Sequence, residues 1–151
     1  MSVIIRSADP RDPGATQLLQ ASQALMRSLF AEDECHFLEI DALAVPSVHF
    51  RVAERNGASI GCGALAIKDG YGEIKSMFTD PAARGLGAAG MILSNLETTA
   101  RGMDLPWLRL ETGTVLHAAH RLYERHGFVS CGPFGDYAEH PASLFYEKHL
   151  D

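Results

Sequence analysis

A glycine-rich segment is the part of this 151-residue sequence whose residue types most clearly suit a ligand. It reads Arg84-Gly85-Leu86-Gly87-Ala88-Ala89-Gly90 and stands between a segment typical of a strand and one typical of a helix. Small residues let a ligand approach the main chain closely, and the free N–H groups and the dipole at a helix start favour an anion. The segment therefore predicts an anion-binding turn; a tight turn without a ligand is the alternative.

Residues Gly85 to Gly90 of this segment also match the GxGxxG pattern of dinucleotide-binding folds. Glu111 lies 21 positions after Gly90, near where a ribose-binding carboxylate is expected. In that fold the first glycine follows its strand almost directly, whereas residues 79–84 intervene here. Only some 40 residues follow Glu111, too few for the rest of that fold. An NAD-binding oxidoreductase therefore remains a remote alternative.

The elements around this turn are read from apolar periodicity and turn residues. Asn56-Gly57 and Asp69-Gly70 separate alternating apolar runs, which predicts an antiparallel meander of three strands over 48–79. Strand, helix and strand from 73 to 111 form a βαβ unit, so those two strands should be parallel. The remaining expected elements are a strand over 2–7, helices over about 13–30, 40–44 and 115–126, a helix capped by Gly102, and last strands over 128–131 and 144–149. The sequence predicts an α+β fold with a mixed, mostly antiparallel sheet.

Two motifs and their spacing resemble one enzyme family. Arg84-x-x-Gly87-x-Ala89 resembles the (Arg/Gln)-x-x-Gly-x-(Gly/Ala) signature of the GCN5-related N-acetyltransferases (GNAT). The segment AHRLYERHGF, residues 119–128, is similar to a later helix of that family, in which a tyrosine precedes Gly-Phe. The resemblance covers about residues 48–149 and, within the family, is greatest to a bacterial subgroup of general acetyltransferases. Some of its members bear an indole-acetate name, although nothing in these residues selects an indole.

The resemblance implies an acetyltransferase that uses acetyl-CoA as co-substrate. The two central parallel strands would splay apart, with about four helices flanking the sheet. The pantetheine arm would pair with the edge of the first of these strands and the pyrophosphate would rest on the glycine turn. The implied cofactor-binding residues are Met77, Phe78, Thr79, Arg84, Gly85, Leu86, Gly87, Ala88 and Ala89. The family often has an asparagine seven residues before the helix tyrosine, where this chain has Leu116.

Two residues match the family's catalytic positions. Tyr123 matches the helix tyrosine, and its phenol, with a pKa that is ordinarily about 10, could protonate the leaving thiolate. Glu73 lies four residues before Met77 and matches a strand glutamate that serves some members as general base through a water. The alternatives are a core tyrosine and a glutamate paired with Lys75. His120 and His36 are further candidates for the base.

The acceptor pocket should come from the N-terminal helical region and the last loop. The predicted substrate-binding residues are His36, Phe134, Asp136 and Tyr137. The predicted reaction is direct acetyl transfer to the amine of a small molecule, through a tetrahedral intermediate. A non-catalytic acyl-CoA sensor on the same fold is the main alternative, because fold does not settle function.

Composition and charge argue against several kinds of partner. A net charge of −6 makes nucleic acid a poor partner, because phosphate binding needs clustered lysine and arginine. The three cysteines form no metal motif, and no metal is expected. No apolar run approaches a membrane span and no secretion signal is apparent, so we expect a cytoplasmic protein without a membrane partner. Residues 1–151 are expected to form one domain, and a homodimer, common in the family, is compatible with the sequence.

Overall fold

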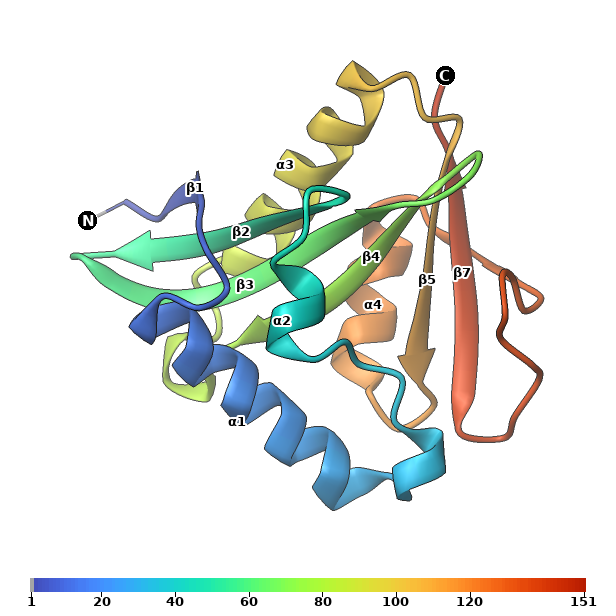
Figure 1. The fold of residues 1–151 in the computed structure, drawn as a ribbon, viewed down its shortest axis with the longest axis horizontal. Helices are drawn as coiled ribbons and strands as arrows, with labels where there is room; N and C mark the ends of the chain where they lie inside the picture. Colours follow the sequence, from blue (N-terminus) through green and yellow to red (C-terminus); the bar gives the residue numbers. More distant parts are fainter. Residues whose placement is uncertain (1) are drawn as a thin grey trace.

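The computed structural model describes residues 2–151, so Met1, which the predicted domain includes, lies outside it. Seven strands form one sheet in the order β1-β2-β3-β4-β5-β7-β6 (Figure 1). The strands are β1 Ile4–Ser7, β2 Val48–Arg55, β3 Ala58–Ile67, β4 Gly72–Thr79, β5 Trp107–Gly113, β6 Val129–Cys131 and β7 Ser143–His149. The α-helices are α1 Pro13–Leu29, α2 Ile40–Leu43, α3 Ala88–Gly102 and α4 His117–Arg125. The predicted mixed α+β fold with four helices is confirmed.

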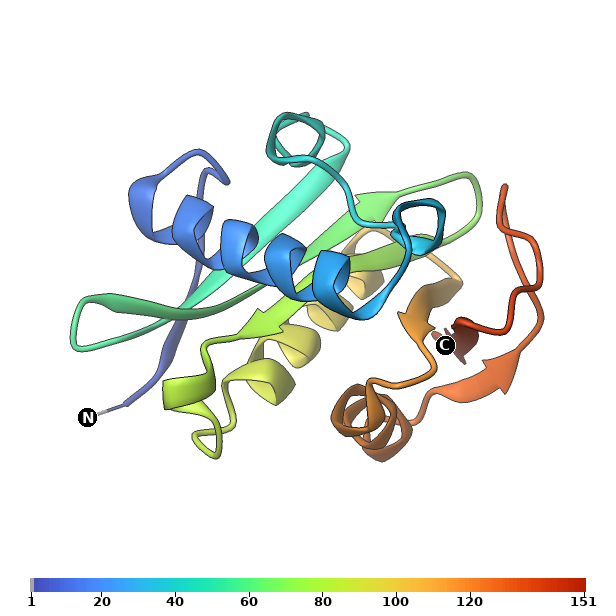
Figure 2. The same cartoon turned by 90° about the horizontal axis from the view of Figure 1, so that it is seen from below.

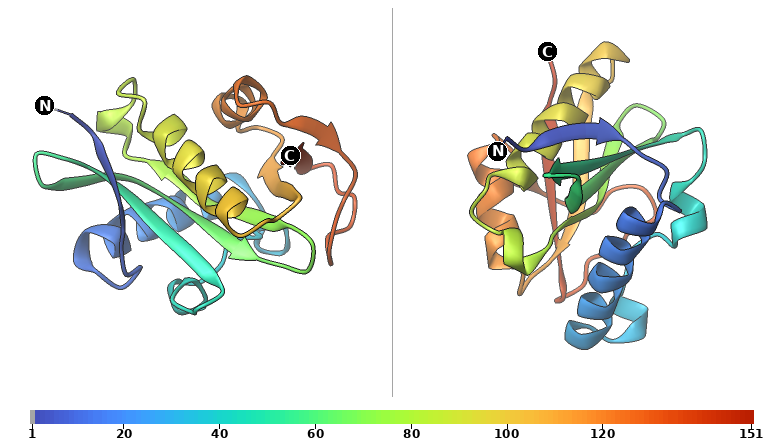
Figure 3. Two further views of the ribbon diagram at one scale, coloured as in Figure 1. Left: turned by 90° about the horizontal axis from the view of Figure 1, so that it is seen from above. Right: turned by 90° about the vertical axis from the view of Figure 1, so that its left-hand side faces the viewer.

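The helices cover both faces of the sheet. Figures 2 and 3 show α1 and α2 on one face and α3 and α4 on the other. Beneath α1, buried Leu18 and Leu19 belong to a cluster with Phe50 and Val52 of β2. On the other side, Leu96 of α3 belongs to a larger cluster that includes strand residues of β3, β4 and β5. The two cores explain why β3, which lies between them, is almost entirely apolar, because both of its faces are buried.

The ends of several elements differ from the prediction. The first strand begins at Ile4 rather than at residue 2, and the helix predicted over 115–126 occupies His117–Arg125. Gly102, predicted as a helix cap, is the last residue of α3, and Met103 caps the helix with an N–H bond to the Ala100 carbonyl. End turns fray because their hydrogen bonds are incomplete, and sequence signals place them less accurately than helix centres.

The hairpin signals are confirmed. Asn56 and Gly57 have φ values of +54° and +78°, and Gly70 has a φ of +83°. These left-handed conformations are the ones that Asn-Gly and Asp-Gly pairs adopt readily in tight hairpins. As a result β2, β3 and β4 form the predicted antiparallel meander.

The two parallel strands separate early. Among the described residues, β4 and β5 pair only at Gly72 with Leu108 and at Glu73 with Arg109. Figure 1 shows the strands diverging from there. Within this stretch β4 also bulges against β3, and Ser76 has a φ of +58°. A bulge bends its strand and redirects the side chains beyond it. The β4 edge that faces β5 is therefore left without a strand partner over residues 74–79.

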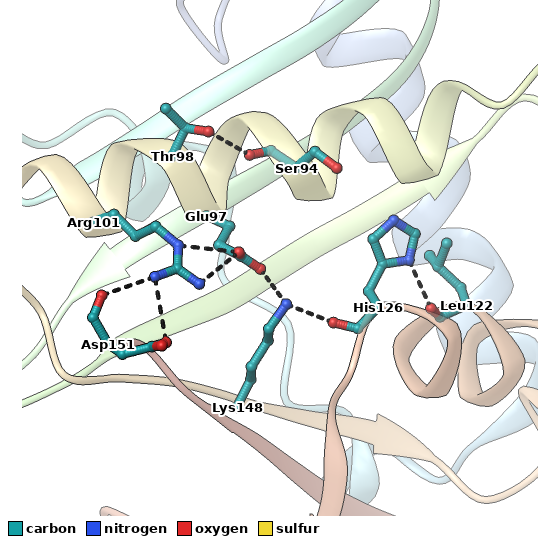
Figure 4. A network of polar contacts seen from close by, with 8 residues as sticks. All are labelled: Ser94, Glu97, Thr98, Arg101, Leu122, His126, Lys148 and Asp151. Carbon is teal, nitrogen blue, oxygen red and sulfur yellow. Dashed lines mark hydrogen bonds and ion pairs between the residues drawn. The ribbon is translucent and has the colours of Figure 1, made fainter.

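An ion-pair network joins α3 to the end of β7 (Figure 4). Lys148 donates to Glu97 Oε1 and to the His126 carbonyl, both at 2.7 Å. Arg101 donates to Glu97 Oε2 at 3.1 Å and to the main-chain oxygen of Asp151 at 3.0 Å. Burial raises the pKa of Glu97, but the hydrogen bonds and charges of Lys148 and Arg101 outweigh it, so the pKa lies below its ordinary value. The network therefore stabilises the contact between the helix layer and the last strand.

Removing Lys148 should make the protein less sensitive to acid. A carboxylate with a lowered folded pKa contributes stability above its unfolded pKa, and loses it as the pH falls through the folded pKa. We expect Lys148→Met to lower the free energy of unfolding by about 1 kcal/mol near neutral pH and by much less at about pH 3. Urea unfolding at both pH values measures the difference. Arg27→Met breaks an exposed pair with Glu39 and should change little; equal losses in both variants would contradict the role of the network.

Candidate active site

The glycine turn exposes its main chain at the start of α3. Gly85 and Gly87 have φ values of +88° and +80°, and Gly87 is the N-cap of the helix. No atom lies within 4 Å of where a Cβ would stand at either glycine. Ala88, by contrast, is buried and anchors the first helical turn in the core. The turn presents unobstructed amides at a helix N-terminus, which suits a phosphate group.

The open edge of β4 leads from this turn into the molecule. Met77 packs against the core beneath α3, whereas Phe78 packs against the core beneath α1. The main chain of Met77, Phe78 and Thr79 lies along the edge that β5 leaves unpaired. An extended ligand can use such an edge as an additional strand would. The residues predicted to bind acetyl-CoA therefore fit an extended arm followed by a phosphate group, although the arginine of the motif, Arg84, is exposed and forms no side-chain hydrogen bond within residues 2–151.

A cavity of about 120 Å³ occupies the space where β4 and β5 diverge. Six parts of the chain contribute to it: α1, the loop after α1, β4, β5, the first turns of α4 and the end of the β6–β7 loop. Its lining includes Met26, Phe30, Glu34, His36, Lys75, Met77, Glu111, Leu116 and Tyr123. The lining combines apolar side chains with two carboxylates. The cavity can therefore hold a small molecule that has an apolar part and a cationic group.

Tyr123 reaches this cavity from α4. The residue is 5% exposed, and its ring packs against Phe128 and Tyr146, with ring centroids 5.8 and 6.3 Å away. Its hydroxyl has no hydrogen bond within residues 2–151, yet no fully enclosed polar side-chain atom there lacks a partner. The hydroxyl must therefore open onto the cavity. Burial, followed by the charge of Glu111, raises the pKa of Tyr123, so the phenol keeps its proton at neutral pH.

Glu73 is buried and already has two partners. The Tyr137 hydroxyl donates to Glu73 Oε2 at 2.6 Å, and Lys75 Nζ lies 3.5 Å from the same oxygen. Lys75 also donates to the Tyr137 hydroxyl at 3.0 Å and to the His36 carbonyl at 2.7 Å. The predicted pairing with Lys75 is therefore present, but the carboxylate is buried rather than exposed. An acceptor amine would reach Glu73 through the Tyr137 hydroxyl or a water.

A second, more open cavity of about 630 Å³ adjoins the first. Of the predicted substrate-binding residues, His36, Asp136 and Tyr137 line it, together with Glu73 and Lys75. Phe134 lines neither cavity and instead packs against Tyr71, Tyr137 and Phe145. The loop between β6 and β7 therefore reaches the first half of β4, where the Tyr137 hydroxyl contacts Glu73 and Lys75.

The sequence did not identify Glu111 and Ser143 as parts of one site. Glu111 appeared only as a ribose-binding candidate of the remote dinucleotide-binding alternative, yet it lines the same cavity as Tyr123. Its position at the carboxyl end of the second parallel strand was an available signal, because ligands bind outside those ends. Ser143 lies 32 residues later and donates to Glu111 Oε2 at 2.8 Å. Nothing local in the sequence indicated that contact.

Three further observations concern the sheet, the metal-ligating side chains and the length of the helices. Over residues 2–151 the sheet has one parallel pair, β4 with β5, which differs from the doubly wound parallel sheet of dinucleotide-binding folds. No cluster of three or more metal-ligating side chains occurs within residues 2–151. In that same range, no helix is both long and apolar enough to cross a membrane.

Comparison with known proteins gives consistent results. The sequence model of the Acetyltransferase (GNAT) family matches residues 15–128. A relative from Azospirillum brasilense, named IAA acetyltransferase, is 39% identical over 151 residues, which is 99% of each chain. An uncharacterized N-acetyltransferase of Escherichia coli K12, YedL, is 35% identical over 149 residues, covering 97% of this chain and 94% of the relative.

Solved structures share the whole architecture. A candidate acyl-CoA N-acyltransferase from Klebsiella pneumoniae is 32% identical, with a TM-score of 0.83 over 99% of this chain and 98% of the other. A PaiA N-acetyltransferase from Thermoplasma acidophilum, solved in complex with coenzyme A, has a TM-score of 0.75 over 99% and 100% of the two chains. It is 15% identical, so that likeness concerns the fold alone. The family match, the two relatives and the shared architecture agree, and this chain belongs to the GNAT family of N-acetyltransferases.

Proposed function

We propose that the protein transfers an acetyl group from acetyl-CoA to the primary amine of a small molecule. The observation that carries this proposal is the cavity between β4 and β5, which lies beside the unpaired β4 edge and receives the Tyr123 hydroxyl. The amides of the glycine turn would hold the pyrophosphate, and the β4 edge would pair with the pantetheine arm. A ligand held in this way would bring its thioester to the cavity.

The residues of the chain can supply each proton and charge that the reaction needs. The amide of Met77 or Phe78, on the open edge, would donate to the developing oxyanion. The Tyr123 hydroxyl would protonate the departing thiolate. A carboxylate would accept the proton that the acceptor ammonium must lose, and Glu73, acting through Tyr137 or a water, is the one that the sequence predicted. The His36 ring lies edge-on to Tyr137, with centroids 5.3 Å apart, and would help to enclose the acceptor.

The charges around the cavities support a cationic acceptor. Six carboxylates line the two cavities, against two lysines: Asp33, Glu34, Glu73, Glu111, Asp136 and Glu139 against Lys68 and Lys75. Such surroundings attract an ammonium group and repel a carboxylate. A small amine with an apolar body therefore suits the site better than an aromatic acid such as indole acetate.

Thermal unfolding with acetyl-CoA, CoA and NADH tests the donor. Ligand at about 100 times its dissociation constant should stabilise the protein by about 2.7 kcal/mol, which raises Tm by about 5–10 °C for a chain of this size. We expect this rise with acetyl-CoA and CoA and none with NADH. No rise with either CoA species would overturn the proposal.

Release of free thiol then tests the transfer. The panel comprises 2-phenylethylamine, butylamine and putrescine, with indole acetate as the anionic contrast. We expect thiol release with at least one amine and none with indole acetate. Acetyl-CoA binding without turnover of any amine would instead favour the non-catalytic sensor.

A further inference from the structure

A carboxylate other than Glu73 stands at the point where the transfer would occur. Glu111 lies near the end of β5 and lines the cavity together with Met77 and Tyr123. Its Oε2 accepts the Ser143 hydroxyl at 2.8 Å. Within residues 2–151, Glu111 Oε1 has no hydrogen-bond donor, so this oxygen is available to an acceptor in the cavity.

Two other carboxylates, Glu73 and Glu34, are less available. Glu73 lines the second cavity and not the first, and the Tyr137 hydroxyl and Lys75 occupy its Oε2. Glu34 lines the first cavity, but its Oε1 accepts the Ala31 amide at 2.9 Å and its Oε2 lies 3.6 Å from His140 Nε2. Glu111 is therefore the carboxylate of the first cavity that has an oxygen to spare.

The surroundings of Glu111 raise its pKa, which suits a general base. Burial raises the pKa of Glu111, and the charge of Glu73 on β4 acts in the same direction. The Ser143 hydroxyl of β7, His36 of the loop after α1 and Lys75 of β4 act in the opposite direction, and the net pKa remains raised. Tyr123 of α4 and Glu34 also line this cavity. A carboxyl whose pKa is closer to neutrality is a more effective general base.

We propose that Glu111, rather than Glu73, binds the acceptor ammonium and takes its proton. The R–NH₃⁺ group gives one proton to the Glu111 carboxylate, and the free amine then attacks the thioester carbon. The C–N bond forms and the C–S bond breaks. The Tyr123 hydroxyl protonates the leaving thiolate, and the phenolate regains a proton from the nitrogen as the amide forms. Glu111 returns its proton to water, so the net products are amide, thiol and one proton.

In this assignment Glu73 is a positioning residue. It holds Lys75 and the Tyr137 hydroxyl, and thereby fixes the wall shared by the two cavities. Ser143 is a positioning residue as well, since its hydroxyl orients the Glu111 carboxylate. The assignment rests on the proposed acetyl transfer and names its general base.

Three variants, Glu111→Gln, Glu73→Gln and Ser143→Ala, separate these roles. kcat/KM is measured against pH with the most active amine of the panel, and acetyl-CoA binding is measured by thermal shift. We expect Glu111→Gln to keep its acetyl-CoA shift, to lose about 100- to 1000-fold in kcat/KM and to lose the fall in activity at acid pH. Glu73→Gln should keep that fall. Ser143→Ala should move it to higher pH, because the lost hydrogen bond had been lowering the pKa of Glu111.

The outcomes that overturn the assignment are distinct from those that overturn the proposed function. A Glu111→Gln enzyme with wild-type kcat/KM and an unchanged acid limb overturns the assignment alone, as does a Glu73→Gln enzyme that loses the acid limb. A wild-type protein that binds acetyl-CoA and turns over no amine overturns the proposed transfer, and the assignment with it. If Glu111→Gln folds poorly, Ser143→Ala still tests the assignment, because it keeps the Glu111 carboxylate and changes only the pH at which activity falls.

Discussion

Replacing Tyr123 by phenylalanine should lower kcat by at least about 100-fold and leave acetyl-CoA binding unchanged. The hydroxyl opens onto the cavity and has no hydrogen-bond partner within residues 2–151, so its removal breaks no contact of the folded protein. The loss of kcat should therefore come from slower departure of the thiolate. Steady-state thiol release gives kcat, and the acetyl-CoA thermal shift gives binding.

Tyr146→Phe is the matched control for this prediction. Tyr146 is equally buried and packs against Tyr123, but its hydroxyl donates to Glu124 and lines no part of the first cavity. We expect this variant to lose some stability and to keep its kcat. Because the pKa of Tyr123 is raised, the wild-type pH profile should have no basic limb from this residue near neutral pH. A Tyr123→Phe enzyme with normal turnover and intact binding would contradict Tyr123 as the acid.

Replacing Gly87 by valine should weaken acetyl-CoA binding by about tenfold or more, which corresponds to about 1.4 kcal/mol. Gly87 has a φ of +80°, a conformation that costs a β-branched residue about 1–2 kcal/mol. The turn can relieve this strain only by rotating the amides that would face the pyrophosphate. Titration of the thermal shift with acetyl-CoA measures the affinity.

Gly57→Val is the matched control, because it places the same side chain at a similar positive φ outside the glycine turn. Gly57 has a φ of +78°, and no atom lies within 4 Å of its Cβ position, as at Gly87. It lies at the turn of the β2–β3 hairpin and lines none of the described cavities. Both variants should lose similar stability without ligand, but Gly57→Val should keep its affinity for acetyl-CoA. Equal loss of affinity in the two variants would show that the glycine turn has no direct part in binding.

Local signals in the sequence were sufficient for most of the fold. Asn56-Gly57 and Asp69-Gly70 required hairpins because few other residue pairs tolerate the left-handed backbone that those turns need. Apolar periodicity located α1 and α3 to within one or two residues. The glycine turn and the tyrosine helix are also local features, since their residues are close together along the chain. For this reason the family could be recognised before any coordinates were known.

The bulge in β4 was not predictable in the same way. Ser76 adopts a φ of +58° although it is neither glycine nor asparagine. Opposite the bulge, Gly63 on β3 leaves room for the Met77 side chain, since a Cβ at Gly63 would meet Met77 Sδ and lie 2.7 Å from Ile92 Cγ2. These contacts join β3, β4 and α3, which are distant in the sequence, and no local preference of Ser76 indicates the bulge. The separation of β4 and β5 was implied only by the family resemblance, and the structure shows that this chain has it.

The sequence by itself determined the elements and the glycine turn, because each depends on residues within a few positions of one another. Tyr123 became a candidate acid through the resemblance of its helix to the family motif, which is likewise a local feature. Only the tertiary structure decided what surrounds the carboxylates. Tyr137 reaches Glu73 across 64 residues and Ser143 reaches Glu111 across 32. Burial and hydrogen bonding decide whether a carboxylate is free to act as a base, and both arise from chain segments that meet only after folding.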